Sequence, residues 1–291
     1  MDIRAILMGL AFAVMWSSAF TSARIIVADA PPLMALALRF SLSGALAVLI
    51  AFGMGQTWRL TRGQWRATII FGICQNALYL GLNFIAMQRI EASLAAIIAS
   101  TMPLLVGVAG WLFAGQRMSP LGVAGLVAGF IGVVIIMGAR MNSGADLYGI
   151  GLCVIGVISL TIATLALRNA SSGGNFVMVV GLQMLIGSAV LWPVGLLLET
   201  PEVTLSLKLA LAFAYTTLIP GLAATLVWFW LVNRIGAVKA ATFHFLNPFL
   251  GVAIAAVILS ESLGVYDLLG VMIITGGILA VQISRQVVRP G

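Results

Sequence analysis

The stretch Arg89–Leu105 reads RIEASLAAIIASTMPLL, and 145 residues later Arg234–Leu250 reads RIGAVKAATFHFLNPFL. The match continues without a gap over residues 89–137 and 234–282, with nine identities in 49 positions. The identities join residues 89, 90, 92, 95, 96, 103, 105, 125 and 132 to the positions 145 further along. Apolar segments match each other by chance, but the constant offset and the shared proline inside an apolar run favour an internal repeat.

The composition places the chain in a lipid bilayer. Of its 291 residues, 62% are hydrophobic and only 8% charged, and the mean hydropathy is +1.16. A soluble domain carries about 25% charged residues, because it needs polar side chains to cover its surface. The net charge of +7 could suggest nucleic acid, but no aromatic and basic stripe or RNA-binding motif accompanies it. Basic residues are typical of cytoplasmic loops in membrane proteins, so nucleic acid is not an expected partner.

Ten apolar segments are long enough to cross a membrane as helices, since a span needs about 20 predominantly apolar residues. Polar and proline-containing stretches such as residues 29–32 and 142–146 separate them. The predicted fold class is therefore an all-α integral membrane protein with ten transmembrane helices. The predicted spans are residues 5–28, 33–53, 65–88, 92–114, 119–138, 147–168, 174–198, 209–232, 237–259 and 264–284.

The charges between these spans are distributed unequally between the two sides of the membrane. The side that holds both termini carries ten basic residues, against four on the other side. Basic residues favour the cytoplasmic side, so this distribution predicts cytoplasmic N- and C-termini and supports an even number of spans. The ten are Arg4, Arg59, Arg62, Arg66, Arg117, Arg168, Arg234, Lys239, Arg285 and Arg289, and the four are Arg24, Arg89, Arg140 and Lys208.

The repeat divides the ten spans into two halves, residues 1–140 and residues 147–291, with five spans in each. Five is odd, so the second half is predicted to enter the membrane upside down relative to the first. Inverted repeats of this kind are typical of transporters. Two similar halves can exchange conformations, and a site at their interface then opens alternately to either side.

A set of scattered residues in both halves resembles a known family. The set comprises Trp16, Arg39-Phe40, Ala86, Arg89-Ile90, Pro103 and Gly125, and in the second half Arg234-Ile235, Ala240-Ala241, Pro248, Glu261 and Gly270. Over essentially its whole length the chain resembles the drug/metabolite transporter superfamily, of the EamA type. Within it, the chain resembles the bacterial inner-membrane exporters of amino acids, including aromatic amino acids.

This resemblance implies two inverted five-helix repeats around a central cavity. The first, third, fourth, sixth, eighth and ninth spans would line the cavity, and the fifth and tenth would support it. The family has an acid at the end of the fourth span, where this chain has Gln116, whereas Glu261 keeps the acid of the ninth span. A symmetric role for two carboxylates is therefore in doubt. Glycines of the fifth and tenth spans, such as Gly125 and Gly270, suit close helix packing or a dimer contact.

Polar side chains in the middle of the third span are candidate site residues. Such groups cost free energy in hydrocarbon unless they are paired or face water or substrate. Asn76, Tyr79 and Asn83 follow one another at spacings of three and four residues, which put them on one face of an α-helix. This face could hydrogen-bond the amino or carboxylate group of a substrate. The alternative is hydrogen bonding between neighbouring helices.

The ninth span carries the only histidine of the chain, His244, followed by Asn247 and Pro248. One interpretation is a substrate contact, with or without a coupled proton, because histidine titrates near neutral pH. The alternative is a neutral histidine that is hydrogen-bonded to a backbone carbonyl. The repeat makes Ala99 and Met102 the counterparts of His244 and Asn247, and predicts that they line the other wall of the cavity.

Three prolines and two tryptophans complete the set of candidates inside the spans. Pro103, Pro220 and Pro248 each remove a backbone hydrogen bond and are predicted to kink their helices. Trp16 and Trp228 lie deeper than the membrane interface, where tryptophan is usually enriched. They are candidates for stacking against an apolar or aromatic part of the substrate, and plain packing is the alternative.

Arg39 is a charged residue inside the second span. It lies six residues from the start of the span, or about 9 Å along a helix. Its side chain could extend to the outer interface, or pair with carbonyls or a carboxylate. We favour a structural role for this residue over a place in the transport pathway.

These features predict a secondary transporter that exports amino acids or similar small metabolites by alternating access. The sequence has no Walker motif, so transport would be driven by a gradient or would be facilitated diffusion. No cofactor or metal site is expected, because no ligand spacing is present. The expected partners are a small amino acid-like substrate and the lipid bilayer of a bacterial inner membrane, and the sequence is compatible with a monomer.

Two alternative functions are weaker. A multidrug or other metabolite exporter of the same superfamily would be expected to hold a carboxylate in the middle of a span, and none is present. A membrane enzyme acting on lipid-linked substrates would need clustered acids or His and Asp residues at the membrane surface. The acids of this chain are few and scattered over the outer loops, so the sequence does not indicate an enzyme.

Overall fold

The computed structural model of the protein describes residues 2–114, 119–142, 144–167, 174–235, 240 and 242–287. These residues form helices and turns, with no β-strand among them. Nine of the described helices are long and apolar enough to cross a membrane, and residues 243–259 form a shorter apolar helix. The chain is thus an all-helical, multi-pass membrane protein. The predicted ninth span, residues 237–259, is only partly described, so the count of ten spans stays a prediction.

Contacts divide the chain into two compact units, and each unit takes segments from both halves of the sequence. The first unit comprises Met1–Thr21, Ile90–Ile150 and Ala224–Gly291. Its helices are α1 (Ile3–Asp29) as far as Thr21, α5 (Ala92–Ser100), α6 (Met102–Ala114), α7 (Pro120–Asn142), the start of α8 (Leu147–Leu167), α11 (Ala224–Ile235), the 3₁₀-helix η3 (Thr242–Leu246), α13 (Asn247–Leu259) and α14 (Val265–Val287).

The second unit comprises Ser22–Arg89 and Gly151–Ala223. Two of its segments, η1 and η2, are π-helices, which are rare and are frequent at functional sites. Its helices are the end of α1, α2 (Pro32–Gly53), α3 (Arg62–Phe71), η1 (Gly72–Tyr79), α4 (Leu80–Ala86), the rest of α8, α9 (Phe176–Leu198), α10 (Leu207–Leu218) and η2 (Ile219–Ala223).

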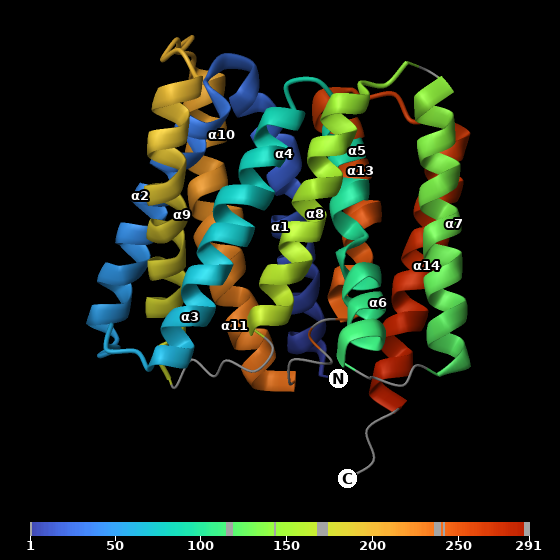
Figure 1. Ribbon diagram of the computed structural model, residues 1–291, viewed down its shortest axis with the longest axis horizontal. Helices are drawn as coiled ribbons and strands as arrows, with labels where there is room; N and C mark the ends of the chain where they lie inside the picture. The colour runs from blue at the N-terminus through green and yellow to red at the C-terminus, as the bar shows by residue number, and fades with distance from the viewer. Residues whose placement is uncertain are drawn as a thin grey trace. The chain divides into compact units, whose positions relative to one another are not determined.

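One pair of long helices dominates the packing inside each unit. In the first unit α7 lies along α14, and in the second α2 lies along α9 (Figure 1). Glycine permits the close approach of α7 and α14: a Cβ on Gly125 would lie 2.7 Å from the carbonyl oxygen of Gly277, and one on Gly132 would lie 2.8 Å from that of Gly270. The residue order in these contacts makes the two helices antiparallel. The glycine faces expected to serve packing or a dimer contact are used here for packing within the chain.

The helix boundaries recur along the chain at the offset of the sequence repeat. Adding 145 to the bounds of α6 and α7 gives the bounds of α13 and α14. The first residues of α3 and α10 are also 145 apart, as are the last residues of α2 and α9. Helix caps follow the same spacing, since Thr61 caps α3 with its side chain and Ser206 caps α10.

Candidate substrate-binding site

Four of the residues singled out in the sequence lie together in the first unit. The ring of His244 is surrounded by Phe12, Trp16 and Trp228, with centroid distances of 5.2, 6.4 and 5.0 Å. All three contacts are edge-to-face, the geometry that the charge distribution of aromatic rings favours. Asn247 joins the cluster through its side chain. His244, Asn247 and both tryptophans are partly exposed.

The contact between His244 and Asn247 defines the chemistry that this cluster offers. The Nδ2 atom of Asn247 lies 2.9 Å from Nδ1 of His244. With its amide nitrogen toward the ring, Asn247 donates and Nδ1 accepts, so a neutral His244 in this arrangement carries its proton on Nε2. Ser17 of α1 approaches the Asn247 side-chain oxygen at 3.5 Å. The cluster therefore offers aromatic faces for an apolar group and an imidazole N–H donor for a polar one.

Local structure explains why these residues converge. Pro248 is in the first turn of α13, where a missing backbone N–H removes no helical hydrogen bond. The five residues before α13 form the 3₁₀-helix η3, which carries His244. Its Phe243 packs over Gly9 of α1, because a Cβ there would lie 2.3 Å from the phenylalanine ring. Glycine at this point lets α1 approach η3 closely.

Phe12 also belongs to this cluster, although it was not among the residues predicted from the sequence. It is 2% exposed, and its ring lies 4.7 Å from that of Trp228 and 5.7 Å from that of Trp16. Phenylalanine in an apolar span gives no signal by itself. Its spacing of four residues from Trp16 does, because residues i and i+4 share a helix face. Applying this rule to each polar or aromatic candidate would have found it.

The three polar residues of the third span point to two different helices of the second unit. Asn76 donates to the backbone oxygen of Gln183 in α9 at 2.8 Å. Asn83 donates to its own helix at Tyr79 and accepts from the thiol of Cys153 in α8 at 3.4 Å. The α-helical spacing predicted one common face. Tyr79 and Asn83 do face the same residue, Gly156 of α8, whereas Asn76 lies within the π-helix of residues 72–79, whose wider turn directs it to α9.

These contacts agree with hydrogen bonding between helices for Asn76 and Asn83, which are 2% and 1% exposed. Tyr79 is buried beside Gly156 of α8, since a Cβ there would lie 3.5 Å from its ring. A substrate contact for these three residues stays a prediction.

The three prolines lie where the helices are interrupted, and a kink at each of them stays a prediction. Pro103 is in the first turn of α6, after α5 has ended at Ser100. Pro220 lies within the π-helix η2, between α10 and α11. The two interruptions at Pro103 and Pro248 are again 145 residues apart.

Arg39 is 6% exposed and packs within the second unit. Its guanidinium carbon lies 5.1 Å from the centre of the Phe40 ring. Its Nη2 atom is 3.5 Å from the point where a Cβ on Gly221 would stand, so the arginine lies against the π-helix η2. This position suits a structural role, which stays a prediction.

Fewer contacts are available for the remaining candidates, Ala99, Met102 and Gln116. Ala99 lies near the end of α5, which packs against α13, and Met102 begins α6. Their role as cavity lining stays a prediction. Gln116 lies outside the described residues. A groove of about 570 Å³ on α6 and α7 is lined by apolar side chains, including Trp111 and Phe130, so it offers no polar contact to a metabolite.

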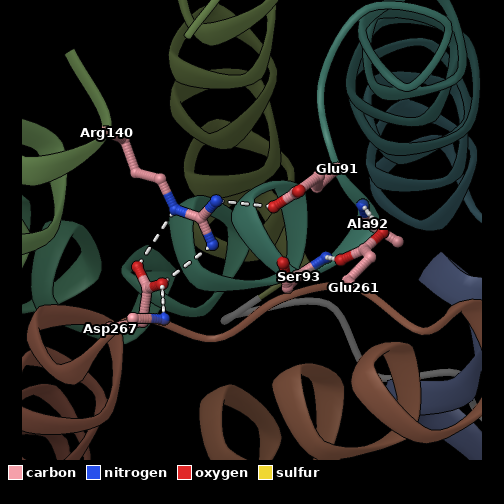
Figure 2. A network of polar contacts seen from close by, with 7 residues as sticks. Glu91, Ala92, Ser93, Arg140, Glu261 and Asp267 are labelled. Atoms are coloured by element: carbon pink, nitrogen blue, oxygen red, sulfur yellow. Dashed lines mark hydrogen bonds and ion pairs between the residues drawn. The ribbon is translucent and has the colours of Figure 1, made fainter. Parts of the chain in front are cut away.

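An ion-pair network joins helix ends of the first unit, as Figure 2 shows. Arg140 of α7 contacts Glu91 at 2.6 Å and Asp267 of α14 at 2.9 Å. Asp267 is 4% exposed and also accepts from the backbone N–H of Gly264. In the sequence these acids are scattered over the outer loops. They are 49 and 127 residues from Arg140, and the only signal was their common location at span ends on one predicted side.

Two glutamates cap helices that begin elsewhere in the chain. Glu261 accepts from the backbone N–H groups of Ala92 and Ser93, at 2.8 and 3.0 Å, and so caps α5 (Figure 2). Glu199 accepts in the same way from Leu33 and Met34, at 2.8 and 2.9 Å, and caps α2. The residues before these two helices provide no side-chain cap of their own. Carboxylates are favourable there, because the first N–H groups of a helix lack partners.

We expect Glu261→Ala to destabilise the protein by about 1–2 kcal/mol, because two N–H groups of α5 lose their acceptor and the helix dipole loses a charge. Thermal unfolding of the purified protein measures this. Glu202→Ala is the control, since Glu202 is exposed and should give no loss. Equal unfolding temperatures for the two variants would rule out an energetic role for the cap.

Comparison with known proteins agrees with this architecture. The chain is 26% identical over 270 residues to the uncharacterized transporter YvbV of Bacillus subtilis (strain 168), covering 92% of this chain and 88% of the relative. It is 24% identical over 285 residues to the uncharacterized inner membrane transporter YedA of Escherichia coli (strain K12), covering 94% and 88%. A crystal structure of a protein with 20% identity matches 97% of this chain and 99% of its own at a TM-score of 0.70, which shows the fold.

The helices and these relatives define a multi-pass membrane protein with a transporter role. The model of the EamA-like transporter family matches the chain twice, at residues 3–138 and 147–283. The chain belongs to the EamA-like transporter family.

Proposed function

We propose that this protein is a secondary transporter that exports amino acids or similar small metabolites, and that the cluster around His244 is part of its substrate site. The observation that carries the proposal is the partly exposed imidazole of η3 among the aromatic rings of α1 and α11, which belong to membrane-spanning segments. A polar side chain at this depth is costly unless it meets a partner, water or a substrate. The rings suit an apolar side chain, and the Nε2–H group suits a carboxylate.

We further propose that transport proceeds by alternating access between two inverted repeats. The recurrence of helix bounds at an offset of 145 supports two equivalent halves, as does the double match of the family model. Inversion is supported by the pairs α7 with α14 and α2 with α9. The members of each pair are equivalent by the offset, and they run antiparallel, as equivalent helices of an inverted repeat must.

The contacts of α7 with α14 also repeat when the halves are exchanged. Gly125 is equivalent to Gly270, and Gly132 to Gly277. Gly125 packs on Gly277 and Gly132 packs on Gly270, so exchanging equivalent residues reproduces the same two contacts. This reciprocity is a property of two-fold symmetry.

A bacterial inner membrane with both termini in the cytoplasm is the setting we propose. Its support is the excess of basic residues on the side of the termini. YedA, a relative of similar length, is named as an inner membrane transporter. A reporter fused to each terminus tests this orientation.

We expect Trp228→Ala to lower transport roughly two- to tenfold, because an aromatic contact contributes about 0.5–1.5 kcal/mol. The measurement is flux of labelled threonine, methionine and phenylalanine into proteoliposomes. The matched control is Trp230→Ala, two residues away on the same helix, because Trp230 is 56% exposed. This control should transport as well as the wild type.

Flux of none of the three amino acids by the wild type would refute the proposed substrate class. Equal flux for Trp228→Ala and Trp230→Ala would remove the aromatic cluster from the site. Proton coupling through His244 is a separate part of the proposal. It would be excluded if His244→Ala kept the pH dependence of wild-type flux.

A further inference from the structure

The loop between α2 and α3 forms a surface that is both basic and aromatic. Arg59, Arg62 and Arg66 are exposed, and the side chain of Trp58 is 58% exposed. Arg62 is the first residue of α3, and its spacing of four residues from Arg66 places the two on one helix face. We call residues 58–66 the basic collar.

Hydrogen bonds fix the backbone of the basic collar. Just before it, the backbone N–H of Thr57 donates to the side chain of Asn175, and the side chain of Gln56 accepts from the backbone N–H of Met178, each at 2.9 Å. These two contacts fasten the loop to the start of α9 in the same unit. Within the collar, Thr61 closes a capping box at the start of α3. The arginines are thus presented from an ordered backbone, which lowers the entropic cost of binding.

The positive charge of the collar has no acidic partner in the described part of the chain. The sequence contains no Asp or Glu between Asp29 and Glu91. The ion pairs among the described residues join other arginines, and none involves the three in the collar. Exposed and uncompensated, this charge is available to an anion.

The fold itself does not require these arginines. The equivalent helix α10 begins 145 residues later with the same kind of cap, Ser206 in place of Thr61. The positions equivalent to the three arginines are Thr204, Leu207 and Leu211. The same turn and helix start form there without them, so a partner outside the chain is a better explanation of the arginines.

The position of the collar identifies that partner. It joins two membrane-spanning helices, α2 and the span of residues 62–86, and therefore lies at a membrane surface. Phe52 and Met54, just before it, are 52% and 56% exposed, so exposed apolar side chains lie close to the basic ones in the sequence. Tryptophan favours the headgroup region of a bilayer, and arginine forms paired hydrogen bonds with phosphate.

We propose that the basic collar binds the phosphate of anionic phospholipid headgroups, with Trp58 in the interfacial layer. The arginines supply hydrogen bonds and charge, and the exposed apolar residues contact the upper part of the acyl chains. The site does not depend on the proposed transport activity.

Titration of the full-length protein in detergent with phosphatidylglycerol and phosphatidylcholine, followed by native mass spectrometry, tests this site. We expect phosphatidylglycerol to bind more tightly, and the preference to shrink as ionic strength rises from about 0.05 to about 0.5 M. Each arginine should contribute roughly fivefold, so R59Q/R62Q/R66Q should weaken binding about 100-fold. The control K208Q, in the first turn of the equivalent helix α10, should bind as the wild type does.

Three results would overturn the proposal. One is equal affinity of the triple variant and the wild type for phosphatidylglycerol. Another is equal binding of the two lipids by the wild type, which decides the matter even if the triple variant does not fold. The third is displacement of phosphatidylglycerol by inorganic phosphate at the same concentration, which would show that the basic collar is a site for free phosphate.

Discussion

Arg140→Met is expected to destabilise the protein by about 3–5 kcal/mol, because it leaves a buried charge without its partner. Asp267 is 4% exposed and loses both contacts with the guanidinium, which are 3.0 and 2.9 Å long. The replacement keeps the length of the apolar stem, so the loss reports the charge. Thermal unfolding of the purified protein in detergent measures it, as a lower unfolding temperature than that of the wild type.

Arg234→Met is the control for this prediction. Arg234 pairs with Asp2 at the surface and hydrogen-bonds it, which lowers the pKa of Asp2 from 3.8 to about 2. The pair is therefore fully charged at neutral pH and would weaken only as the pH falls from about 4 through 2. Water screens exposed pairs, so we expect no measurable loss of stability at neutral pH. A second variant, Arg140→Met with Asp267→Leu, should recover part of the loss, and equal unfolding temperatures for Arg140→Met and Arg234→Met would contradict the prediction.

Membrane spans could be predicted from the sequence because bilayer thickness sets one simple condition, an apolar run of about 20 residues. The predicted second span, 33–53, differs by one residue from α2 (Pro32–Gly53), and the seventh, 174–198, ends with α9 (Phe176–Leu198). Span counting does not detect changes of helix type within a run. The π-helices at residues 72–79 and 219–223 have the same apolar composition as their surroundings.

The candidate site was only partly predictable, because local sequence shows neither a change of helix type nor which helices meet. Trp16, Trp228 and His244 were found because such side chains are unusual in mid-membrane, and the structure brings them together. Asn76 was assigned to one face with Asn83 on the assumption of α-helical turns, which the π-helix invalidates. The network at Arg140 depends on which helix ends meet, and this follows from packing and not from local sequence.

The offset of 145 residues can be compared directly between the sequence and the helix bounds. Nine identities in 49 positions are weak evidence, but the bounds of α13 and α14 equal those of α6 and α7 at the same offset. Helix bounds depend on caps, prolines and apolar length together, and these persist when individual side chains change. The offset therefore predicts structure better than the identities suggest. The charges do not follow it, since the arginines of the basic collar have no basic counterparts at positions 204, 207 and 211.

Gly277→Ala should destabilise the protein by about 1–3 kcal/mol, as expected when a side chain is forced into a packed interface. The new Cβ would lie 2.6 Å from the carbonyl oxygen of Gly125, 2.7 Å from the backbone nitrogen of Gly129 and 2.9 Å from its Cα. All three are backbone atoms of α7, so no side chain can rotate away. The two helices must separate, which also loosens the contacts on either side.

Gly276→Ala, one residue earlier on the same helix, is the matched control. A Cβ there meets nothing within 4 Å, and alanine favours a helix over glycine by roughly 0.5–1 kcal/mol. We therefore expect this variant to unfold at the same temperature as the wild type or slightly above it. If both variants lost stability equally, the close approach of α7 and α14 would not be what restricts the size of the side chain at position 277. Opposite signs for two neighbouring glycines would show that backbone contact, and not helix propensity, selects glycine at this position.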